Sequence, residues 1–436
     1  MSGPRVQVVT LGCPKNQVDS EVLLAQLKLG DASIVPEGEA ADVTVVNTCG
    51  FIEAAKRESV DAILFAVRDK EAGRVKQVFV MGCLSERYAT DLSREIPEVD
   101  AFFGSHEIES VVKRTGVDVR RELLGERYLT TPLHFAYIKI SEGCDRPCSF
   151  CAIPLMRESH VSKPLEMIVS EARRLAEKGV RELMVIGQDT TYYGLDTYGS
   201  RRLREVLELL SSDERLRWIR LMYAYPAGFP LEILPVMRER KNLCKYLDIP
   251  LQHISDPVLR SMRRGTTGSD IRRLVQQIQD EVPGIALRTT LIVGYPNETE
   301  KDFQQLYDFV EETRFHRLGV FTYSREDGTA ADELGDPIPE EVKLERQAAI
   351  MQLQTDISEE RNRQLLGTEI TVLIDRRDGE TFVGRTEWDA PEIDQEVYVE
   401  SDVPLKSGSF YTVQITRSED HDLFGVPVTT SVAVTL

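Results

Sequence analysis

The feature that most constrains the fold is a unit of about 35 residues that occurs three times in the first third of the chain. Each unit starts with a short apolar segment and continues into a helical pattern; the segments are Val6–Thr10, Val43–Asn47 and Gln77–Met81, and the first helix is expected from about Ser20. Strand–turn–helix units at this spacing predict βαβ connections and a parallel sheet. Because such crossovers are nearly always right-handed, we expect the three strands to point the same way.

A cysteine beside a glycine follows each of these strands, at Cys13, Cys49 and Cys83. The carboxyl ends of parallel strands share one edge of the sheet, and open α/β sheets bind ligands there. A cysteine is also a small apolar residue that fills strand ends, so one alone would say little. Three at equivalent positions favour a ligand set.

A second set of cysteines lies on one loop. The predicted strand Phe135–Ile140 leads into Cys144, Cys148 and Cys151, with no fourth thiol or histidine nearby. A structural zinc ion needs four ligands, whereas a four-iron cluster held by three cysteines leaves one iron open to a substrate. The spacing therefore favours a catalytic iron–sulfur cluster.

The remainder of the chain predicts two further folds. Strand and helix patterns alternate up to Arg317–Tyr323, which indicates a full or partial α/β barrel. A long charged helix is expected over Pro339–Leu366, and short alternating strands from Glu369 onward indicate a small closed β-barrel. We therefore expect an α/β protein with three domains, residues 1–134, 135–363 and 364–436.

Composition narrows the environment and the partners. The 436 residues carry a formal charge of −19, which argues against a general nucleic-acid coat and against DNA binding. No apolar stretch is long enough to span a membrane, and no secretory signal is visible. Seven cysteines in such a chain are expected to be reduced, as in the cytoplasm.

The cysteine loop resembles that of the radical S-adenosylmethionine enzymes, and the three earlier cysteine motifs resemble the amino-terminal domain of the methylthiotransferases within that superfamily. The resemblance implies two [4Fe–4S] clusters, S-adenosylmethionine as cofactor and a carboxyl-terminal TRAM domain. It also suggests cofactor contacts at strand ends, namely Gln188, Asp189 and Gly294. Tyr192 is a further candidate for the cofactor pocket, and aromatic packing is an equally good interpretation of it. The chain departs from the family at two positions. The family usually has a glycine shortly after the cysteine loop, where this chain has Glu158, and it often has an arginine where this chain has Lys163.

Residues 246–253, 321–329 and 389–394 are similar to the methylthiotransferases that modify an aspartate β-carbon of ribosomal protein twelve of the small subunit. The competing substrate is transfer RNA. Residues 364–436 contain five basic and fourteen acidic residues, and an acidic domain suits a basic protein better than RNA. We expect the carboxylates of Glu387, Asp389, Glu392 and Asp394 to face this partner.

Several questions stay open at this level. An electron donor and a sulfur source are required, and neither is named by the sequence. A non-catalytic iron–sulfur scaffold is an alternative that explains the cysteines but not the α/β barrel. Cys244 is expected to pack in the barrel, and His253 is equally compatible with a site role and a structural hydrogen bond.

Overall fold

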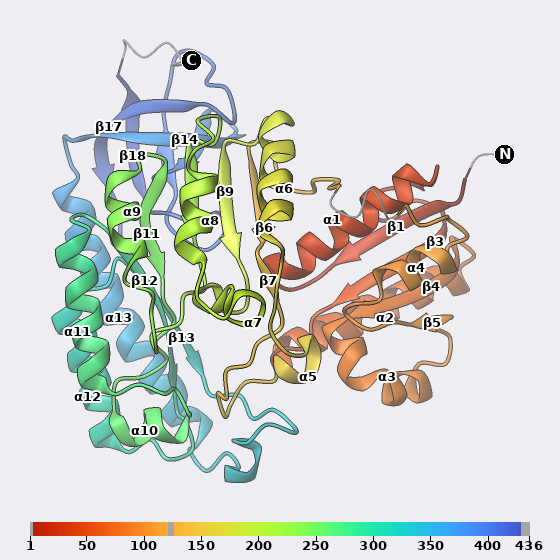
Figure 1. Cartoon of the computed structure of the whole chain (residues 1–436), viewed down its shortest axis with the longest axis horizontal. Helices are drawn as coiled ribbons and strands as arrows, with labels where there is room; N and C mark the ends of the chain where they lie inside the picture. Colours follow the sequence, from red (N-terminus) through yellow and green to blue (C-terminus); the bar gives the residue numbers. More distant parts are fainter. Residues whose placement is uncertain (1–2, 121–125, 429–436) are drawn as a thin grey trace.

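The computed structural model describes residues 3–120 and 126–428, so the outermost parts of the expected first and third domains lie outside the described residues. Figure 1 shows three units: an amino-terminal sheet with helices, a larger α/β unit in the middle, and a small β-barrel near the carboxyl terminus. No helix within these residues is long and apolar enough to cross a membrane.

The amino-terminal sheet is parallel, as predicted. It contains β1 (Arg5–Thr10), β2 (Ser33–Ile34), β3 (Ala41–Thr48), β4 (Val75–Gly82) and β5 (Ala101–Phe102), in the order β2-β1-β3-β4-β5. One face packs on α1 (Pro14–Leu29) and α4 (Ile108–Arg114), and the other on α2 (Glu53–Glu71) and α3 (Cys83–Glu95). The three cysteine-bearing strands are adjacent neighbours in this sheet.

The first helix begins earlier than the sequence suggested. α1 starts at Pro14, directly after Cys13, rather than near Ser20. A proline fits the first turn of a helix because its missing N–H has no intrahelical partner there. The first turn therefore lies beside a candidate ligand.

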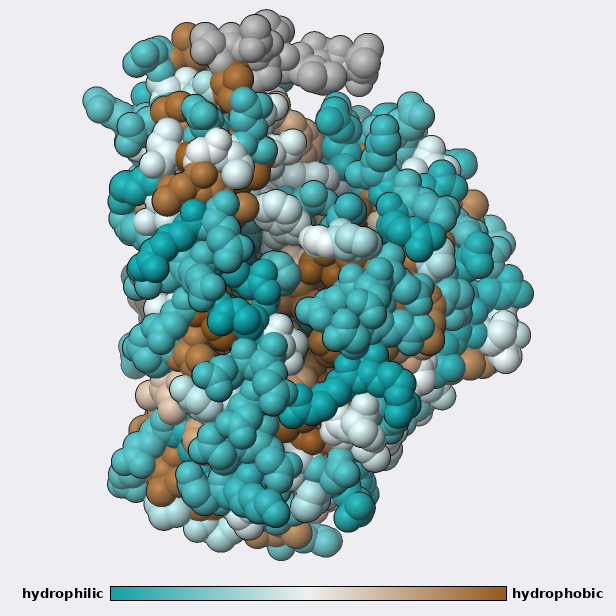
Figure 2. Space-filling view, turned by 90° about the vertical axis from the view of Figure 1, so that its left-hand side faces the viewer, coloured by the Kyte–Doolittle hydropathy of each residue, from teal (hydrophilic) through white to brown (hydrophobic). Residues whose placement is uncertain are grey.

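The middle unit is a partial barrel. Its six parallel strands follow one another in chain order: β6 (Phe135–Lys139), β9 (Glu182–Ile186), β10 (Trp218–Leu221), β11 (Leu243–Asp248), β12 (Ala286–Val293) and β13 (Arg317–Thr322). The helices on its outer side are α6 (Leu165–Glu177), α8 (Leu203–Leu210), α9 (Ile233–Glu239), α11 (Gly268–Glu281) and α12 (Glu300–Thr313). On the face shown in Figure 2, hydrophilic side chains predominate and hydrophobic ones form narrow strips between them.

Both edges of the open barrel are covered, which protects the unpaired backbone of the edge strands. α1 packs beside β6, and Val18 joins the residues that fill the inner side of the barrel. On the other edge, α13 (Glu340–Gln364) packs along β13, and the Gln347 side chain donates to the Val320 carbonyl oxygen at 2.7 Å. The amino-terminal unit is thus part of the barrel wall.

The carboxyl-terminal unit is a closed barrel, as predicted. Its strands are β14 (Glu369–Asp378), β15 (Thr381–Arg385), β16 (Val397–Val399), β17 (Phe410–Ser418) and β18 (Leu423–Pro427). It contacts the first residues of the middle strands: Arg385 pairs with Glu182 at 2.8 Å, and the rings of Trp218 and Phe410 lie 4.9 Å apart. It therefore closes the amino-terminal end of the partial barrel (Figure 1).

The prediction that four acidic residues face a partner is wrong for two of them. The Asp389 carboxylate is fully buried and accepts from Arg317 Nε at 2.8 Å. The Asp394 side chain is 2% exposed, and it accepts from the Tyr246 hydroxyl at 2.8 Å and from Arg288 Nε at 3.3 Å. Buried arginines of the middle unit need carboxylate partners, so these acids hold two units together.

The other two acids behave differently. The half-buried Glu387 carboxylate accepts from the backbone N–H of Lys245 at 3.2 Å. Glu392 is exposed. Of the four residues, only Glu392 is free to meet a partner in the way that the sequence suggested.

Candidate functional site

The structure brings the first three cysteines to one edge of the amino-terminal sheet. Burial raises the pKa of the Cys49 thiol to about 11, and the neighbouring Cys13 and Cys83 add to the rise. Gly12 has a φ of +86°, and a side chain there would place its Cβ 2.8 Å from Cys49 Sγ. The glycine therefore allows the turn after β1 to approach the second thiol.

Two buried asparagines hold these turns together. Asn16 Nδ2 donates to the Leu11 and Thr48 carbonyl oxygens, both at 2.9 Å, and so joins the ends of β1 and β3. Asn47 Nδ2 donates to the Asn16 carbonyl oxygen at 3.0 Å. Both residues lie in the sequence motifs, but nothing in the motifs indicates that their side chains bridge the strands.

The second cysteine set lies on the loop between the short strands β7 (Ser141–Glu142) and β8 (Val161–Ser162). Burial raises the pKa of Cys144 to about 11 and of Cys151 to about 12, and Cys148 adds to both. The Sγ atom of Cys148 accepts a hydrogen bond from Arg264 Nη1 at 3.3 Å and lies 3.4 Å from the Tyr225 hydroxyl. Such thiols stay protonated until a metal replaces the proton.

The departure at Glu158 has a structural consequence. Its φ of 58° and ψ of −164° lie in a region that glycine adopts far more easily than other residues. The Glu158 carbonyl oxygen accepts from the backbone N–H of Cys144 at 3.1 Å. Backbone strain is therefore stored next to the cysteine loop.

The departure at Lys163 has a simpler explanation. Its ammonium group pairs with the buried carboxylate of Glu171, which also accepts from Arg127 Nη1 at 2.8 Å. Lysine supplies here the positive charge that an arginine would supply.

Arg157 connects the two cysteine sets. It ends the short helix α5 (Pro154–Arg157), six residues after Cys151, and only 2% of it is exposed. Its Nε donates to Cys83 Sγ at 3.2 Å, and its Nη1 donates to Asp19 at 2.7 Å. Cys83 also packs in a small apolar cluster with Ala152 and Met156. The two cysteine sets therefore adjoin across the interface between the first two units.

Three of the four suggested cofactor contacts lie around Arg146, which stands between Cys144 and Cys148. The Arg146 Nε donates to Asp189 at 2.6 Å, and its guanidinium lies 5.3 Å from the centre of the Tyr192 ring. Gln188 is nearby, bonded to Glu142 at 3.5 Å. Two polar atoms here are buried with no hydrogen-bond partner among the described residues, Arg146 Nη2 and Gln188 Oε1. Buried polar atoms are nearly always bonded, so these fit a polar ligand.

The fourth suggested contact, Gly294, has a structural reason of its own. It ends β12 with a φ of +74°, and a Cβ there would lie 2.3 Å from the Lys343 side chain. Its neighbour Tyr295 is linked to the cysteine loop, with its hydroxyl 2.9 Å from Ser149 Oγ. Gly294 is therefore near the loop, although no contact joins the two directly within the described chain.

Sequence reasoning also missed an arginine–tyrosine stack. The Tyr225 ring lies between the guanidinium groups of Arg146 and Arg264, at 4.0 and 4.2 Å from its centre. The position of Arg146 inside the cysteine loop was the only available signal.

Cys244 is 1% exposed and packs with Trp218 and Tyr246 inside the barrel, as predicted. His253 is fully buried, and its Nδ1 accepts from the backbone N–H of Ser255 at 3.0 Å. The Nε2 atom of His253 lies 3.5 Å from the Glu298 carboxylate and has no hydrogen-bond partner among the described residues, so one ring nitrogen is structural and the other is open.

Each cysteine set offers three thiols. A structural zinc ion needs four ligands, whereas a [4Fe–4S] cluster held by three cysteines leaves one iron open, so the donor sets fit such a cluster. Within residues 3–120 and 126–428, no group of three His, Cys, Asp or Glu side chains is arranged to hold a single metal ion.

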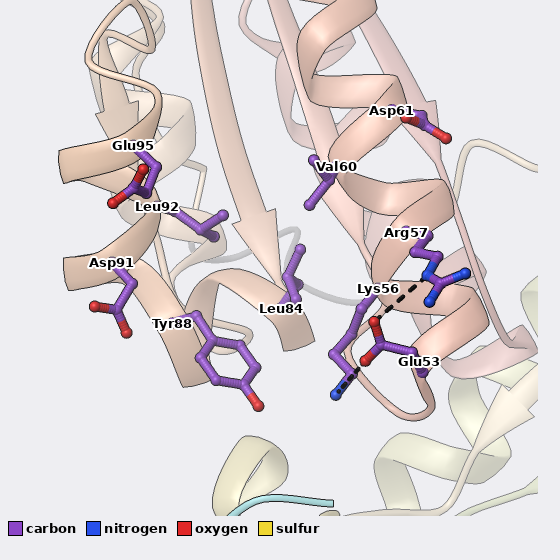
Figure 3. Close-up of a pocket in the computed structure, with 10 residues that line it drawn as sticks. All are labelled: Glu53, Lys56, Arg57, Val60, Asp61, Leu84, Tyr88, Asp91, Leu92 and Glu95. Atoms are coloured by element: carbon purple, nitrogen blue, oxygen red, sulfur yellow. Dashed lines mark ion pairs between the residues drawn. The ribbon is translucent and has the colours of Figure 1, made fainter. Parts of the chain in front are cut away.

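A cavity of about 450 Å³ lies away from this junction, between α2 and α3 (Figure 3). Val60, Leu84 and Leu92 form its apolar part, and the ion-paired Glu53 and Arg57 lie at its rim. Leu84 follows Cys83 directly, so the cavity flanks the outer side of the first cysteine set. We assign no ligand to it.

Three family models match the chain. Residues 5–104 match the uncharacterized protein family UPF0004, residues 138–310 the radical SAM superfamily, and residues 366–428 the TRAM domain. The radical SAM superfamily implies a [4Fe–4S] cluster and S-adenosylmethionine as cofactors.

Solved structures support the fold. The radical S-adenosylmethionine methyltransferase TsrM from Kitasatospora setae, with tryptophan and a SAM analog bound, is 13% identical with a TM-score of 0.57, covering 86% of this chain and 79% of that one. The cobalamin-dependent S-adenosylmethionine radical enzyme OxsB is 14% identical with a TM-score of 0.51, covering 80% and 56%.

Curated relatives are much more similar. The ribosomal protein uS12 methylthiotransferase RimO of Christiangramia forsetii is 53% identical over 425 residues, which cover 97% of this chain and 94% of the relative. Proteins with the same name from Chloroherpeton thalassium and Bacteroides thetaiotaomicron are 53% and 49% identical, each over 97% of this chain and 98% of the relative. The alternative of a non-catalytic scaffold is therefore wrong. By this similarity along nearly its whole length, the chain belongs to the RimO family and is a radical SAM methylthiotransferase.

Proposed function

We propose that this protein attaches a methylthio group to the β-carbon of an aspartate in ribosomal protein uS12. The observation that carries the proposal is that Arg157, on the loop of the second cysteine set, donates a hydrogen bond to Cys83 of the first set. The chain's relatives are named ribosomal protein uS12 methylthiotransferases. Each set is proposed to hold one [4Fe–4S] cluster, with Cys13, Cys49 and Cys83 for the first and Cys144, Cys148 and Cys151 for the second. Residues 1–134, 135–363 and 364–436 would then act as three units.

When bound, the second cluster and S-adenosylmethionine supply a radical that removes a hydrogen atom from carbon, and the first cluster supplies sulfur. The protein's own residues position these groups and exclude water. Arg157 and Arg264 each donate a hydrogen bond to a cysteine sulfur, Arg157 to Cys83 and Arg264 to Cys148, and so hold these side chains in place. The closed end of the barrel keeps solvent from the opposite side.

The cofactor contacts are proposed from the unpartnered atoms at the second set. Arg146 Nη2 and Gln188 Oε1 provide a cation and an acceptor for the carboxylate and amino groups of S-adenosylmethionine. Asp189 fixes the guanidinium of Arg146, and Tyr192 lies against it. Gly294 is proposed as a backbone contact at the end of β12.

The partner is proposed to be a basic ribosomal protein, and the protein is placed in the cytoplasm, where ribosomes lie. Among the fourteen acidic residues of segment 364–436, the buried Asp389 and Asp394 serve the domain contacts, but others are exposed, including Glu380, Glu400 and Asp402. These favour a cationic protein over transfer RNA. A second molecule of S-adenosylmethionine is proposed to donate the methyl group, leaving S-adenosylhomocysteine, and an electron donor and a sulfur source complete the reaction.

The test is mass spectrometry of uS12 from cells with and without this gene. We expect a methylthio-aspartate only when the gene is present. Transfer RNA from the same cells is digested to nucleosides and analysed in parallel. Loss of a methylthio-nucleoside with unmodified uS12 in both strains would contradict the proposal.

A further inference from the structure

Lys15 is a buried cation without a carboxylate partner. It lies in the first turn of α1, two residues after Cys13, and is 8% exposed. Its Nζ lies over the face of the Tyr223 ring, 2.9 Å from the ring centre. Across the described residues, no hydrogen bond or ion pair joins this ammonium group to a carboxylate.

The other buried cations near this junction are paired. Lys139 contacts the carboxylates of Asp19 and Glu142, and Arg157 Nη1 donates to Asp19 at 2.7 Å. A buried charge without a partner is strongly unfavourable, so proteins pair such charges or reserve them for a ligand. This contrast indicates that the positive charge of Lys15 is kept for a ligand.

The two carboxylates whose charge acts on Lys15 are already engaged, and the Cys13 thiol acts on it as well. Asp248 accepts from Arg288 Nη1 at 2.9 Å and from the backbone N–H of Tyr223 at 3.0 Å. Glu142 contacts Lys139 and accepts from Gln188 Nε2 at 3.5 Å. Neither carboxylate forms an ion pair with the Lys15 ammonium group.

Tyr223 is held in place by an unusual backbone. It follows β10 with a φ of 59°, a value uncommon for an aromatic residue. The bond to Asp248 on its N–H side and the bond from the backbone N–H of Thr190 to its carbonyl oxygen, at 3.1 Å, fix this conformation. Strain of this kind concentrates at functional sites. The ring therefore forms a fixed support for the ammonium group.

We infer that Lys15 binds the side-chain carboxylate of the target aspartate, and thereby selects aspartate over asparagine; this inference rests on the proposed function. The β-carbon of aspartate is bonded directly to the carboxylate carbon. Fixing the carboxylate beside the first cysteine set therefore also fixes the carbon that must react. Lys15 is thus a specificity-determining residue of the substrate site.

The test is a binding cycle with the reconstituted holoenzyme. Two forms of uS12 are compared, the natural protein and one in which the target aspartate is replaced by asparagine. The wild-type enzyme should bind the natural form about tenfold more tightly or better, because a buried ion pair is lost with asparagine. Lys15→Met should bind the two forms within about twofold of each other, whereas Lys15→Arg should retain most of the discrimination.

Lys70→Met is the matched control. Lys70 is a partly buried lysine of the same unit, paired with Asp100 at 2.7 Å near the carboxyl end of α2. It should discriminate as the wild type does. Iron content is measured for every variant, so that cluster loss is recognised.

Two results would overturn the inference. One is that the wild-type enzyme binds both uS12 forms equally, a result that can be obtained without any enzyme variant. The other is a Lys15→Met variant that keeps its full iron content and still discriminates between the two uS12 forms as the wild type does. If this variant also bound S-adenosylmethionine more weakly, Lys15 would be assigned to the cofactor and not to the substrate. Failure of the proposed function is distinct, since wild-type enzyme would then leave natural uS12 unmodified.

Discussion

The two cysteine sets reach the same number of ligands by opposite routes. Cys13, Cys49 and Cys83 are spread over seventy-one residues and meet only because three adjacent parallel strands end at one edge. Cys144, Cys148 and Cys151 lie within eight residues of one loop. The first set thus depends on the complete sheet, and the second on local backbone geometry.

The two sets also share one feature. In each set, one sulfur atom accepts a hydrogen bond from a buried arginine of the middle unit. Arg157 donates to Cys83 at 3.2 Å, and Arg264 donates to Cys148 at 3.3 Å. The first site is therefore completed by a residue outside its own unit. The interface between the units therefore contacts the first cysteine set directly.

The largest effect is expected when the second set is removed. Replacing Cys144, Cys148 and Cys151 by Ala should abolish formation of 5′-deoxyadenosine and remove about half the iron. The measurement is product analysis after anaerobic reconstitution, with an iron assay. Detection of 5′-deoxyadenosine from this variant would show that the loop does not hold the catalytic cluster.

Removing the first set should separate the two roles. With Cys13, Cys49 and Cys83 replaced by Ala, about half the iron should again be lost, and sulfur insertion should cease. Cleavage of S-adenosylmethionine should persist, since the second loop is intact. A variant that keeps all its iron, or still modifies uS12, would refute the assignment of these ligands.

Arg157 tests whether the two sets depend on each other. Arg157→Leu removes a donor from Cys83 and one cation from buried Asp19, which should lower the free energy of unfolding by about 3 kcal/mol. The measurement is denaturant unfolding of the reduced apoprotein. Arg94→Ala, an exposed ion-paired position on α3, is the control and should change stability by less than about 1 kcal/mol. Equal effects of the two changes would argue against a special role of Arg157.

The smallest effect is expected on the barrel surface. Changing the exposed Glu380, Glu400 and Asp402 to Lys should slow association with uS12 severalfold at low salt, because surface charges act mainly on association rate. Screening over about 8–10 Å should remove the difference at physiological salt. Stopped-flow association across a salt series measures this. A rate that does not change at any salt concentration would mean that these acids serve solubility alone.

Much of the fold could be predicted from periodicity. The predicted strands Val6–Thr10 and Phe135–Ile140 match β1 and β6 to within one residue, because their apolar residues pack into the cores of the two units. The start of α1 was missed because this helix buries polar residues as well as apolar ones, among them Lys15, Asn16 and Asp19. An interface between units hides the amphipathic signal on which sequence reasoning depends.

The prediction that the acidic residues face a partner was wrong for Asp389 and Asp394 for a related reason. Charge counting cannot tell a carboxylate in solvent from one that is paired with a buried arginine. Asp389 and Asp394 belong to the second kind, and their partners Arg317 and Arg288 lie about 70 and 100 residues away in sequence.

The sequence by itself determined the two cysteine sets, the three folds and the superfamily, because spacing and periodicity are local properties of the chain. Only the tertiary structure decided that Arg157 joins the two cysteine sets and that Lys15 is buried without a carboxylate partner. The physical reason is that the energy of a buried charge depends on which groups surround it, and those groups come from distant segments.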